Sequence, residues 1–112
     1  MDEDKIYDEL FEMSSIGPKT TGIEKVIIWV GPNASQPEMR IKVCNTPDKI
    51  SIDTFSITIP DLQIAGKINE KFITPELLER IKKWILVNQK AIEDYSNREI
   101  FTYDFLLRIK KV

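Results

Sequence analysis

The longest amphipathic pattern in the chain runs from Thr74 to Tyr95. At 100° per residue its apolar side chains fall on one stripe, and most charged side chains lie elsewhere. Thr74 is a favourable N-cap, and Pro75 suits the first helical position because it lacks an amide hydrogen that would need a partner there. We therefore predict a helix over residues 74–95 whose stripe packs on the rest of the fold. The stripe consists of Leu77, Leu78, Ile81, Trp84, Ile85, Asn88, Ile92 and Tyr95.

Four shorter runs have the pattern of β-strands. Residues 24–30 are rich in β-branched and aromatic side chains, and residues 39–45, 55–59 and 62–68 alternate between apolar and polar side chains. The alternation slips by one residue just before the third run, which indicates a bulge or a break, and Gly66 indicates a bend or bulge in the fourth. The short connections predict an antiparallel meander with one face buried under the long helix.

The first 22 residues have a different composition. Residues 3–13 combine an apolar side with an acidic side, which predicts a short amphipathic helix. The next stretch, SSIGPKTTG, breaks any period and is typical of a linker. We therefore expect an acidic N-terminal helix and linker over 1–22 and a single α+β core domain over 23–112.

Two patterns compete over residues 101–110. Alternate residues from Phe101 to Ile109 are apolar, as in a strand. Thr102 can also cap a helix in which Phe105, Leu106 and Ile109 share one face. The second pattern is favoured, so the expected fold is α+β: a four-stranded antiparallel β-meander packed against one long helix, with a short N-terminal helix and a short C-terminal helix.

Composition is typical of one globular domain. The chain has 112 residues, of which 42% are hydrophobic and 30% charged, and its net charge is −2. By segment, the charge is −4 over residues 1–22 (two bases, six acids), −1 over 23–70 (five bases, six acids) and +3 over 71–112 (nine bases, six acids). The acidic start lacks the layout of a secretory signal, and no apolar run is long enough to span a bilayer, so we expect a cytoplasmic protein without membrane contact.

The residues that usually carry catalysis or bind metal are scarce. The chain has no histidine and one cysteine, Cys44, for which no companion base stands at a motif spacing. We expect Cys44 to be a half-buried structural thiol, and we expect no catalytic residue, no cofactor and no metal. Asn88 is the one amide inside the apolar stripe, and we expect it to tie the helix to the backbone of a sheet edge, with ligand binding as the alternative.

Candidate binding residues fall into two groups. One group is basic, from a strand face and the C-terminal end; solvated surface is the ordinary explanation of such charges. The other group is apolar: Leu86 lies opposite the buried stripe and Trp29 lies on the first strand, whereas Trp84 is expected in the core. The candidate surface comprises Trp29, Arg40, Lys42, Lys67, Leu86, Arg108, Lys110 and Lys111.

Three motifs carry a resemblance to a known group of proteins: IWVGPNASQPEMRIKVCN, FSITIPDLQIAGKI and IKKWILVNQKAIEDYSNREIFTYDFLLRIKK. Together they resemble small bacterial and phage-borne domains of unknown function of the DUF4160 type, which are found near toxin–antitoxin genes. The resemblance covers residues of about 25 to 111 and implies a helix over 102–111. Many members carry a His-Phe-His near the second strand that this chain lacks, so no activity resting on those histidines is carried over.

These observations favour a non-catalytic protein-interaction module, with an antitoxin-like or phage-related role implied by the resemblance. Its expected partner is another protein, or a second copy bound through the N-terminal helix. The alternative is a weak nucleic-acid-binding protein that uses the basic strand face and the basic C-terminal end.

Overall fold

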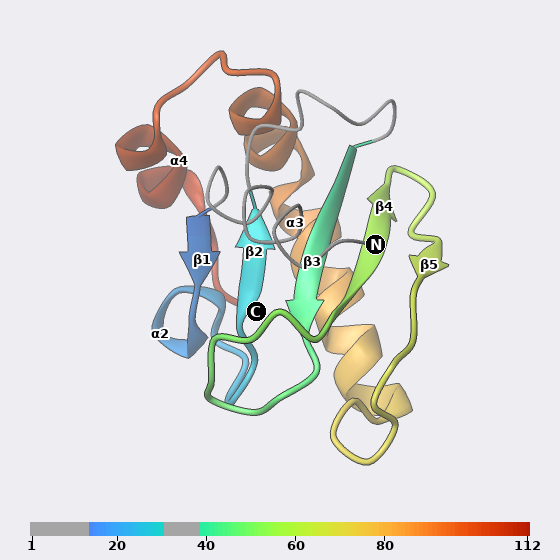
Figure 1. The fold of residues 1–112 in the computed structure, drawn as a ribbon. Coiled ribbons are helices and arrows are strands. Elements are labelled where there is room, and N and C mark those ends of the chain that lie inside the picture. Colours follow the sequence, from blue (N-terminus) through green and yellow to red (C-terminus); the bar gives the residue numbers. More distant parts are fainter. Residues whose placement is uncertain (1–13, 31–38) are drawn as a thin grey trace.

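The computed structural model describes residues 14–30 and 39–112, and it shows an α+β fold (Figure 1). The strands form one antiparallel sheet in sequential order, so each strand pairs with its neighbour in the chain. The strands are β1 (Ser14–Ile16), β2 (Ile28–Val30), β3 (Met39–Cys44), β4 (Thr54–Ile59) and β5 (Ile64–Ala65). The helices are α2 (Pro18–Thr21), α3 (Pro75–Ser96) and α4 (Thr102–Arg108).

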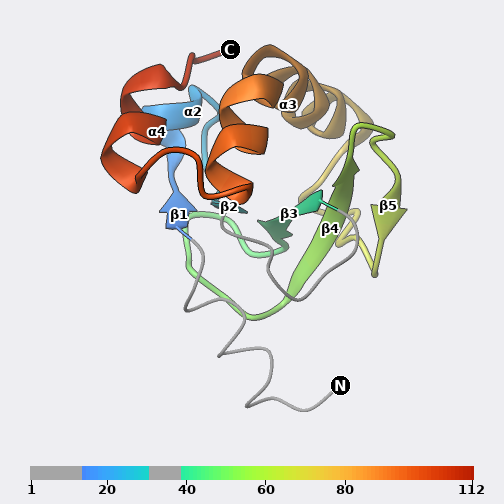
Figure 2. The same cartoon turned by 90° about the horizontal axis from the view of Figure 1, so that it is seen from above.

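The three helices of the described residues lie on the same side of the sheet (Figure 2). The strand residues that face them are apolar and almost completely buried, including Ile28, Val43 and Phe55, which pair in register across three strands. The opposite face of the sheet, which we call the outer face, carries mostly polar side chains. This is the expected division for an antiparallel sheet that helices cover on one side only.

The linker prediction for residues 14–22 was wrong. Ser14–Ile16 pairs with β2 as a fifth, edge strand, and Ile16 is only 1% exposed. Pro18–Thr21 forms one helical turn that ends at Gly22 in the left-handed region, with φ +80°. A three-residue strand and a four-residue helix are too short to show a period, so pattern analysis could not separate them from a loop.

Two of the predicted strands are shorter than expected. β2 begins at Ile28, not at residue 24, because Lys25 adopts a positive φ of +66° that breaks the extended run. β5 contains only Ile64 and Ala65, and it ends at Gly66, whose φ of +95° confirms the predicted bend. The third predicted strand begins at Thr54, where the alternation slipped. The predicted helix over residues 3–13 lies outside the described residues, as do residues 31–38 between β2 and β3.

The long helix is confirmed almost residue for residue. The hydroxyl Oγ1 of Thr74 accepts a hydrogen bond from the backbone N–H of Leu77 at 3.2 Å, as expected of an N-cap. Trp84 is fully buried, as predicted, in a core that joins the apolar face of the sheet to the stripe of α3. The helical prediction for the C-terminal segment is also confirmed, although the N-cap of α4 is Phe101 and not Thr102.

Candidate functional site

The helix α4 is fixed to α3 by one aromatic stack. Phe105 is fully buried, and its ring lies parallel to that of Tyr95, with the ring centroids 4.4 Å apart and the planes 7° apart. The hydroxyl groups of Tyr95 and Thr102 form a hydrogen bond of 2.8 Å. These contacts determine which face of the short helix points inward, and so which face is left to the solvent.

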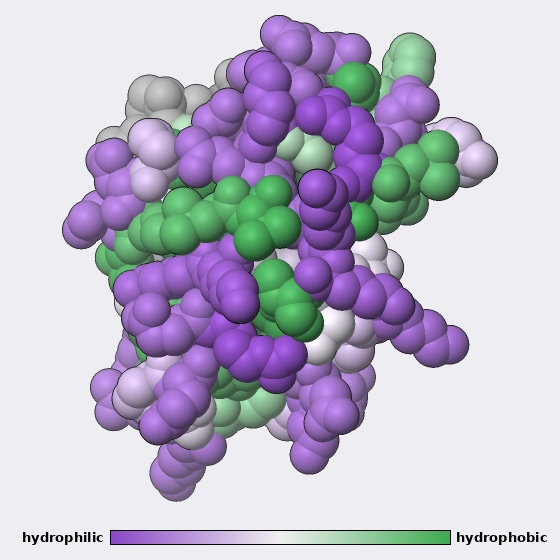
Figure 3. Space-filling view, turned by 180° about the vertical axis from the view of Figure 1, so that it is seen from behind, coloured by the Kyte–Doolittle hydropathy of each residue, from purple (hydrophilic) through white to green (hydrophobic). Residues whose placement is uncertain are grey.

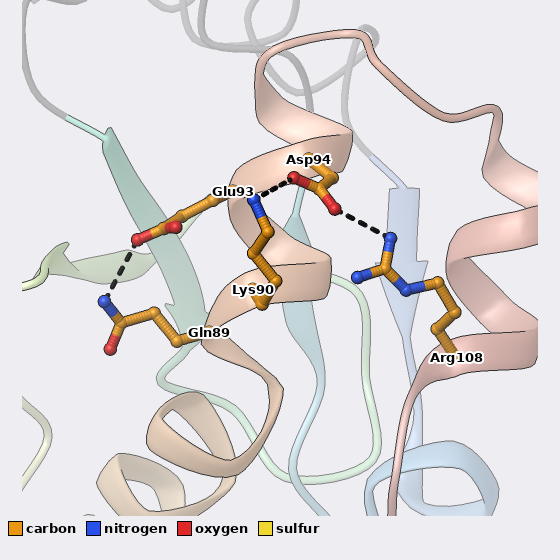
Figure 4. Close-up of polar contacts among 5 residues, drawn as sticks. All are labelled: Gln89, Lys90, Glu93, Asp94 and Arg108. Carbon is orange, nitrogen blue, oxygen red and sulfur yellow. Dashed lines mark hydrogen bonds and ion pairs between the residues drawn. The ribbon is translucent and has the colours of Figure 1, made fainter.

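A small ion-pair network strengthens the same junction (Figure 4). One carboxylate oxygen of Asp94 accepts a hydrogen bond from Nη1 of Arg108 at 2.8 Å, and the other lies 3.0 Å from Nζ of Lys90. The hydrogen bond from Arg108 and then that from Lys90 lower the pKa of Asp94 below its ordinary value of 3.8, while the same contact with Asp94 raises the pKa of Lys90. The network therefore holds α4 to α3 most firmly when Asp94 is ionised.

This junction predicts a defined response to acid. The lowered pKa of Asp94 means that its contribution to stability is complete above a pH of about 3.8 and is lost as the pH falls through the lower pKa of the folded state. We expect Asp94→Asn to lower the melting temperature at neutral pH, and we expect the difference from wild type to shrink once the pH falls below about 3.8. Asp61→Asn, at an exposed turn between β4 and β5, is the control. A difference for Asp94→Asn that stays constant down to pH 2 would contradict this role.

Asn88 holds the last residues of the chain. Its Oδ1 accepts a hydrogen bond from the backbone N–H of Lys110 at 2.7 Å, and its Nδ2 donates to the carbonyl oxygens of Lys110 and Trp84, each at 2.9 Å. The side chain is 3% exposed. The predicted attachment to backbone is thus present, but the partner is the segment after α4 and not a sheet edge.

The outward face of α4 is apolar, which is the reverse of an ordinary surface helix. Tyr103, Leu106 and Leu107 are 72%, 44% and 68% exposed, and positions three and four residues apart share one face of a helix. Phe101, immediately before the helix, is 84% exposed. We call these four residues the α4 patch. The prediction had placed Leu106 on the same buried face as Phe105, but a helix of two turns buries only Phe105.

The outward face of α3 is different. Its exposed apolar residues, Leu86 (55% exposed) and Val87 (47% exposed), are surrounded by charged positions of the same helix. Seen from behind the sheet, the molecule shows hydrophobic side chains in separate areas with hydrophilic side chains between them (Figure 3). The exposure of Leu86 was predicted. A single exposed leucine among charges is common and does not by itself make a binding site.

The predicted basic residues do not form one surface. Arg40 and Lys42 lie on the outer face of the sheet, where Lys42 is only 8% exposed. Lys67 follows β5, and its carbonyl oxygen accepts a hydrogen bond from Nδ2 of Asn45. The others, Arg108, Lys110 and Lys111, belong to α4 and the segment after it, on the helical side. Trp29 lies on the outer face beside Lys42, where it is half-buried.

A hollow of about 790 Å³ lies beside the end of β5. One of its lining residues, Asn45, is 2% exposed and joins the loop after β3 to the segment after β5: Nδ2 donates to Asp53 and Lys67, and Oδ1 accepts from the N–H of Asn69. The hollow is wide open, and the polar groups of Asn45 are already used in bonds within the chain. This arrangement fixes two loops to each other, and it leaves those groups no spare capacity for a ligand.

No family model, curated protein or solved structure matches the chain. Within the described residues there is no cluster of three or more histidine, cysteine, aspartate or glutamate side chains that could hold a metal ion. None of the helices described has the length and apolar character needed to cross a membrane. Cys44 is fully buried rather than half-buried, with its thiol donating to the carbonyl oxygen of Ser51 at 3.6 Å.

The α4 patch is the part of the site that sequence analysis missed. Residues 101–107 contain five large apolar side chains, Phe101, Tyr103, Phe105, Leu106 and Leu107. One face of a two-turn helix can bury only one or two of them, so the excess itself was a signal of exposed apolar surface. The competing strand and helix patterns concealed it, because each pattern assigned a different subset of these residues to the core.

Proposed function

We propose that the protein is a non-catalytic interaction module that binds another protein through the α4 patch. The observation that carries this proposal is the exposure of Tyr103, Leu106 and Leu107 on a helix that is firmly attached to α3, together with that of Phe101 just before the helix. An anchored helix with an apolar outward face presents a preformed surface, so little conformational entropy is lost on binding.

The size of the patch suits the centre of a protein interface. An aromatic side chain offers about 150–250 Å², so the exposed fractions of Phe101 and Tyr103 alone correspond to roughly 230–390 Å². With the two leucines, the patch reaches the range of about 300–600 Å² that marks the largest, often functional, apolar patch of a monomer. A standard interface buries about 800 Å² on each partner, so a polar rim must supply the remainder.

The charges around the patch indicate the chemistry of the partner. Residues 97–112 contain four bases, Arg98, Arg108, Lys110 and Lys111, and two acids, Glu99 and Asp104, which gives a net charge of +2. We therefore expect the partner to present an apolar segment bordered by acidic side chains, because complementary charges at a rim speed association and exclude wrong partners. The resemblance to small bacterial and phage-borne domains suggests an antitoxin-like or phage-related setting for such a pair.

The proposal is tested by changing one exposed leucine at a time. Leu107→Lys places a charge in the centre of the patch, whereas Leu86→Lys makes the same change at a similarly exposed leucine on α3. We expect Leu107→Lys to weaken binding of a partner purified from native lysate by at least about tenfold, which corresponds to about 1.4 kcal/mol, and Leu86→Lys to leave it unchanged. Calorimetry gives the two dissociation constants, and thermal melting of each variant confirms that the fold is intact.

An equal loss of binding in both lysine variants, or unchanged binding in both, would contradict the assignment of the α4 patch as the binding surface.

The alternative of a weak nucleic-acid-binding protein has a separate signature. Its affinity for a random duplex would fall steeply as salt rises and would respond to charge reversal of Lys110 and Lys111, not to Leu107→Lys. The separation of the basic residues on two sides of the sheet does not favour this alternative.

A further inference from the structure

The helix α3 ends in a backbone conformation that does not suit its sequence. The N–H of Glu99 donates to the carbonyl oxygen of Asp94 at 2.8 Å, and the N–H of Arg98 donates to that of Tyr95 at 3.1 Å. These two bonds form a Schellman motif, and they place Arg98 in the left-handed region, with φ +61°. Glycine is the usual residue at this position, because a β-carbon makes the left-handed conformation unfavourable. The turn at the end of α3 is therefore strained at Arg98.

The local sequence does not require the helix to stop there. From Glu76 to Arg108 the chain contains neither glycine nor proline, the two residues that interrupt helices most strongly. Residues 97–101 connect α3 to α4, and we call them the hinge. Arg98 and Glu99 of the hinge are exposed and are good helix formers. Residues 75–108 can therefore continue as one helix, about 50 Å long at 1.5 Å per residue, once α4 is released from its own α3.

The contacts that hold α4 and the last residues each join a residue before the hinge to a residue after it. They include the aromatic stack, the ion pair drawn in Figure 4, the clamp by Asn88 and one backbone hydrogen bond of 3.0 Å. The pairs are Tyr95 with Phe105, Asp94 with Arg108, Asn88 with Lys110, and Thr21 with Val112. None of these contacts requires both residues to belong to the same copy, so α4 of a second copy can make them all.

We propose that residues 102–112 exchange between two copies of this chain to form a dimer. In the exchanged dimer the hinge is helical and joins α3 to α4, and each copy receives α4 of the other. The closed monomer and the exchanged dimer contain the same contacts at each junction, so their free energies differ through the hinge and through the cost of association. Relief of the left-handed conformation of Arg98 in both copies favours the dimer, which mass action populates as the protein concentration rises.

A charge exchange in the full-length chain detects this dimer directly. Asp94→Arg places two arginines at the junction and Arg108→Asp places two aspartates there, so each variant weakens its own closed form. In an exchanged heterodimer of the two variants, both junctions combine opposite charges. After the variants are unfolded and refolded together, we expect native mass spectrometry to show at least about ten times more heterodimer than either homodimer. Statistical proportions of the three dimers, or the absence of the heterodimer, would overturn the proposal.

Hinge variants provide a second test that leaves the junction intact. Arg98→Gly relieves the strain of the closed turn and weakens the continuous helix, so it should raise the dissociation constant of the dimer at least about tenfold. Asn97→Ala favours the helix and should lower that constant. Light scattering over a range of concentrations measures both. Constants that are equal to that of the wild type in both variants, or a wild type that stays monomeric at its highest soluble concentration, would overturn the proposal.

The α4 patch is a different surface, and one further variant separates the two. Loss of the dimer in Leu107→Lys would overturn the exchange in favour of association through the patch, whereas a dimer that persists in Leu107→Lys and weakens in Arg98→Gly supports it. None of these measurements involves another protein. The exchange can therefore fail while the proposed function stands, and the reverse.

Discussion

We expect Trp84→Ala to lower the free energy of unfolding by roughly 3–5 kcal/mol, the range observed when a large aromatic side chain is truncated in a core. Trp84 is 0% exposed and stands in the middle of the α3 stripe, where it packs within the cluster formed by the helix and the apolar face of the sheet. The neighbouring β-strands cannot close the space that the indole leaves. Denaturant unfolding of the variant and the wild type measures the difference directly.

A matched variant separates lost volume from lost hydrogen bonding. The indole Nε1 of Trp84 is buried and has no hydrogen-bond partner among the described residues. Trp84→Phe therefore removes part of the packing but no hydrogen bond. It should lower the free energy of unfolding much less than Trp84→Ala does. An unchanged denaturation midpoint for Trp84→Ala would refute the packing of α3 on the sheet, and equal losses for both variants would show that volume is not the deciding factor.

The elements that the sequence predicts correctly are those with enough residues to show a period. The 22 residues of α3 repeat their stripe six times, and Thr74 and Pro75 mark its start chemically, so its bounds agree with the structure. The strands β3 and β4 are recognisable for the same reason. The missed elements, β1 and α2, have three and four residues, and at that length only tertiary contacts determine the structure.

The candidate site was predictable only in part, for two physical reasons. First, sequence position does not show whether a strand residue will lie on the same side of the sheet as a given helix. Arg40 and Arg108 were therefore grouped as one basic surface, although the sheet separates them. Second, the inward face of α4 is selected by the stack of Phe105 on Tyr95, a contact between residues ten apart in sequence on different helices. Local periodicity cannot show such a contact, so Tyr103 and Leu107 were not identified as exposed.

Asn88 illustrates a prediction that was right in kind and incomplete in detail. Its place inside an apolar stripe required hydrogen-bond partners, since an unsatisfied buried amide costs about 1–3 kcal/mol. Its partners include the N–H and C=O of Lys110. The amide of Asn88 therefore pairs with the backbone of this residue in the way that one β-strand residue pairs with another. Asn88 thereby fixes the segment that follows the α4 patch.

The isosteric change Asn88→Asp should be among the most destabilising single substitutions in this chain at neutral pH. The carboxylate can still accept from the N–H of Lys110, but its second oxygen would face the carbonyl oxygens of Lys110 and Trp84, where Nδ2 now donates. We expect the free energy of unfolding to fall by more than about 1–3 kcal/mol. That range is the cost of leaving one buried group unsatisfied, and the repulsion between the oxygens adds to it.

The pH dependence of this variant provides its sharpest signature. Burial and the two carbonyl oxygens raise the pKa of the introduced carboxyl in the folded state, because its neutral form can donate to the carbonyl of Lys110 and its charged form cannot. A raised pKa in the folded state means that the variant is least impaired below the ordinary pKa of about 3.9 and loses stability as the pH rises through the raised value. The melting temperature of Asn88→Asp relative to that of the wild type should therefore fall as the pH rises from 4 to 7, and protonation of the carboxyl at low pH should restore most of this loss.

Asn97→Asp adds the same charge at the exposed end of α3 and should show no such trend. A penalty for Asn88→Asp that is independent of pH would mean that Asn88 fills space in the core and does not clamp the C-terminal segment through its hydrogen bonds.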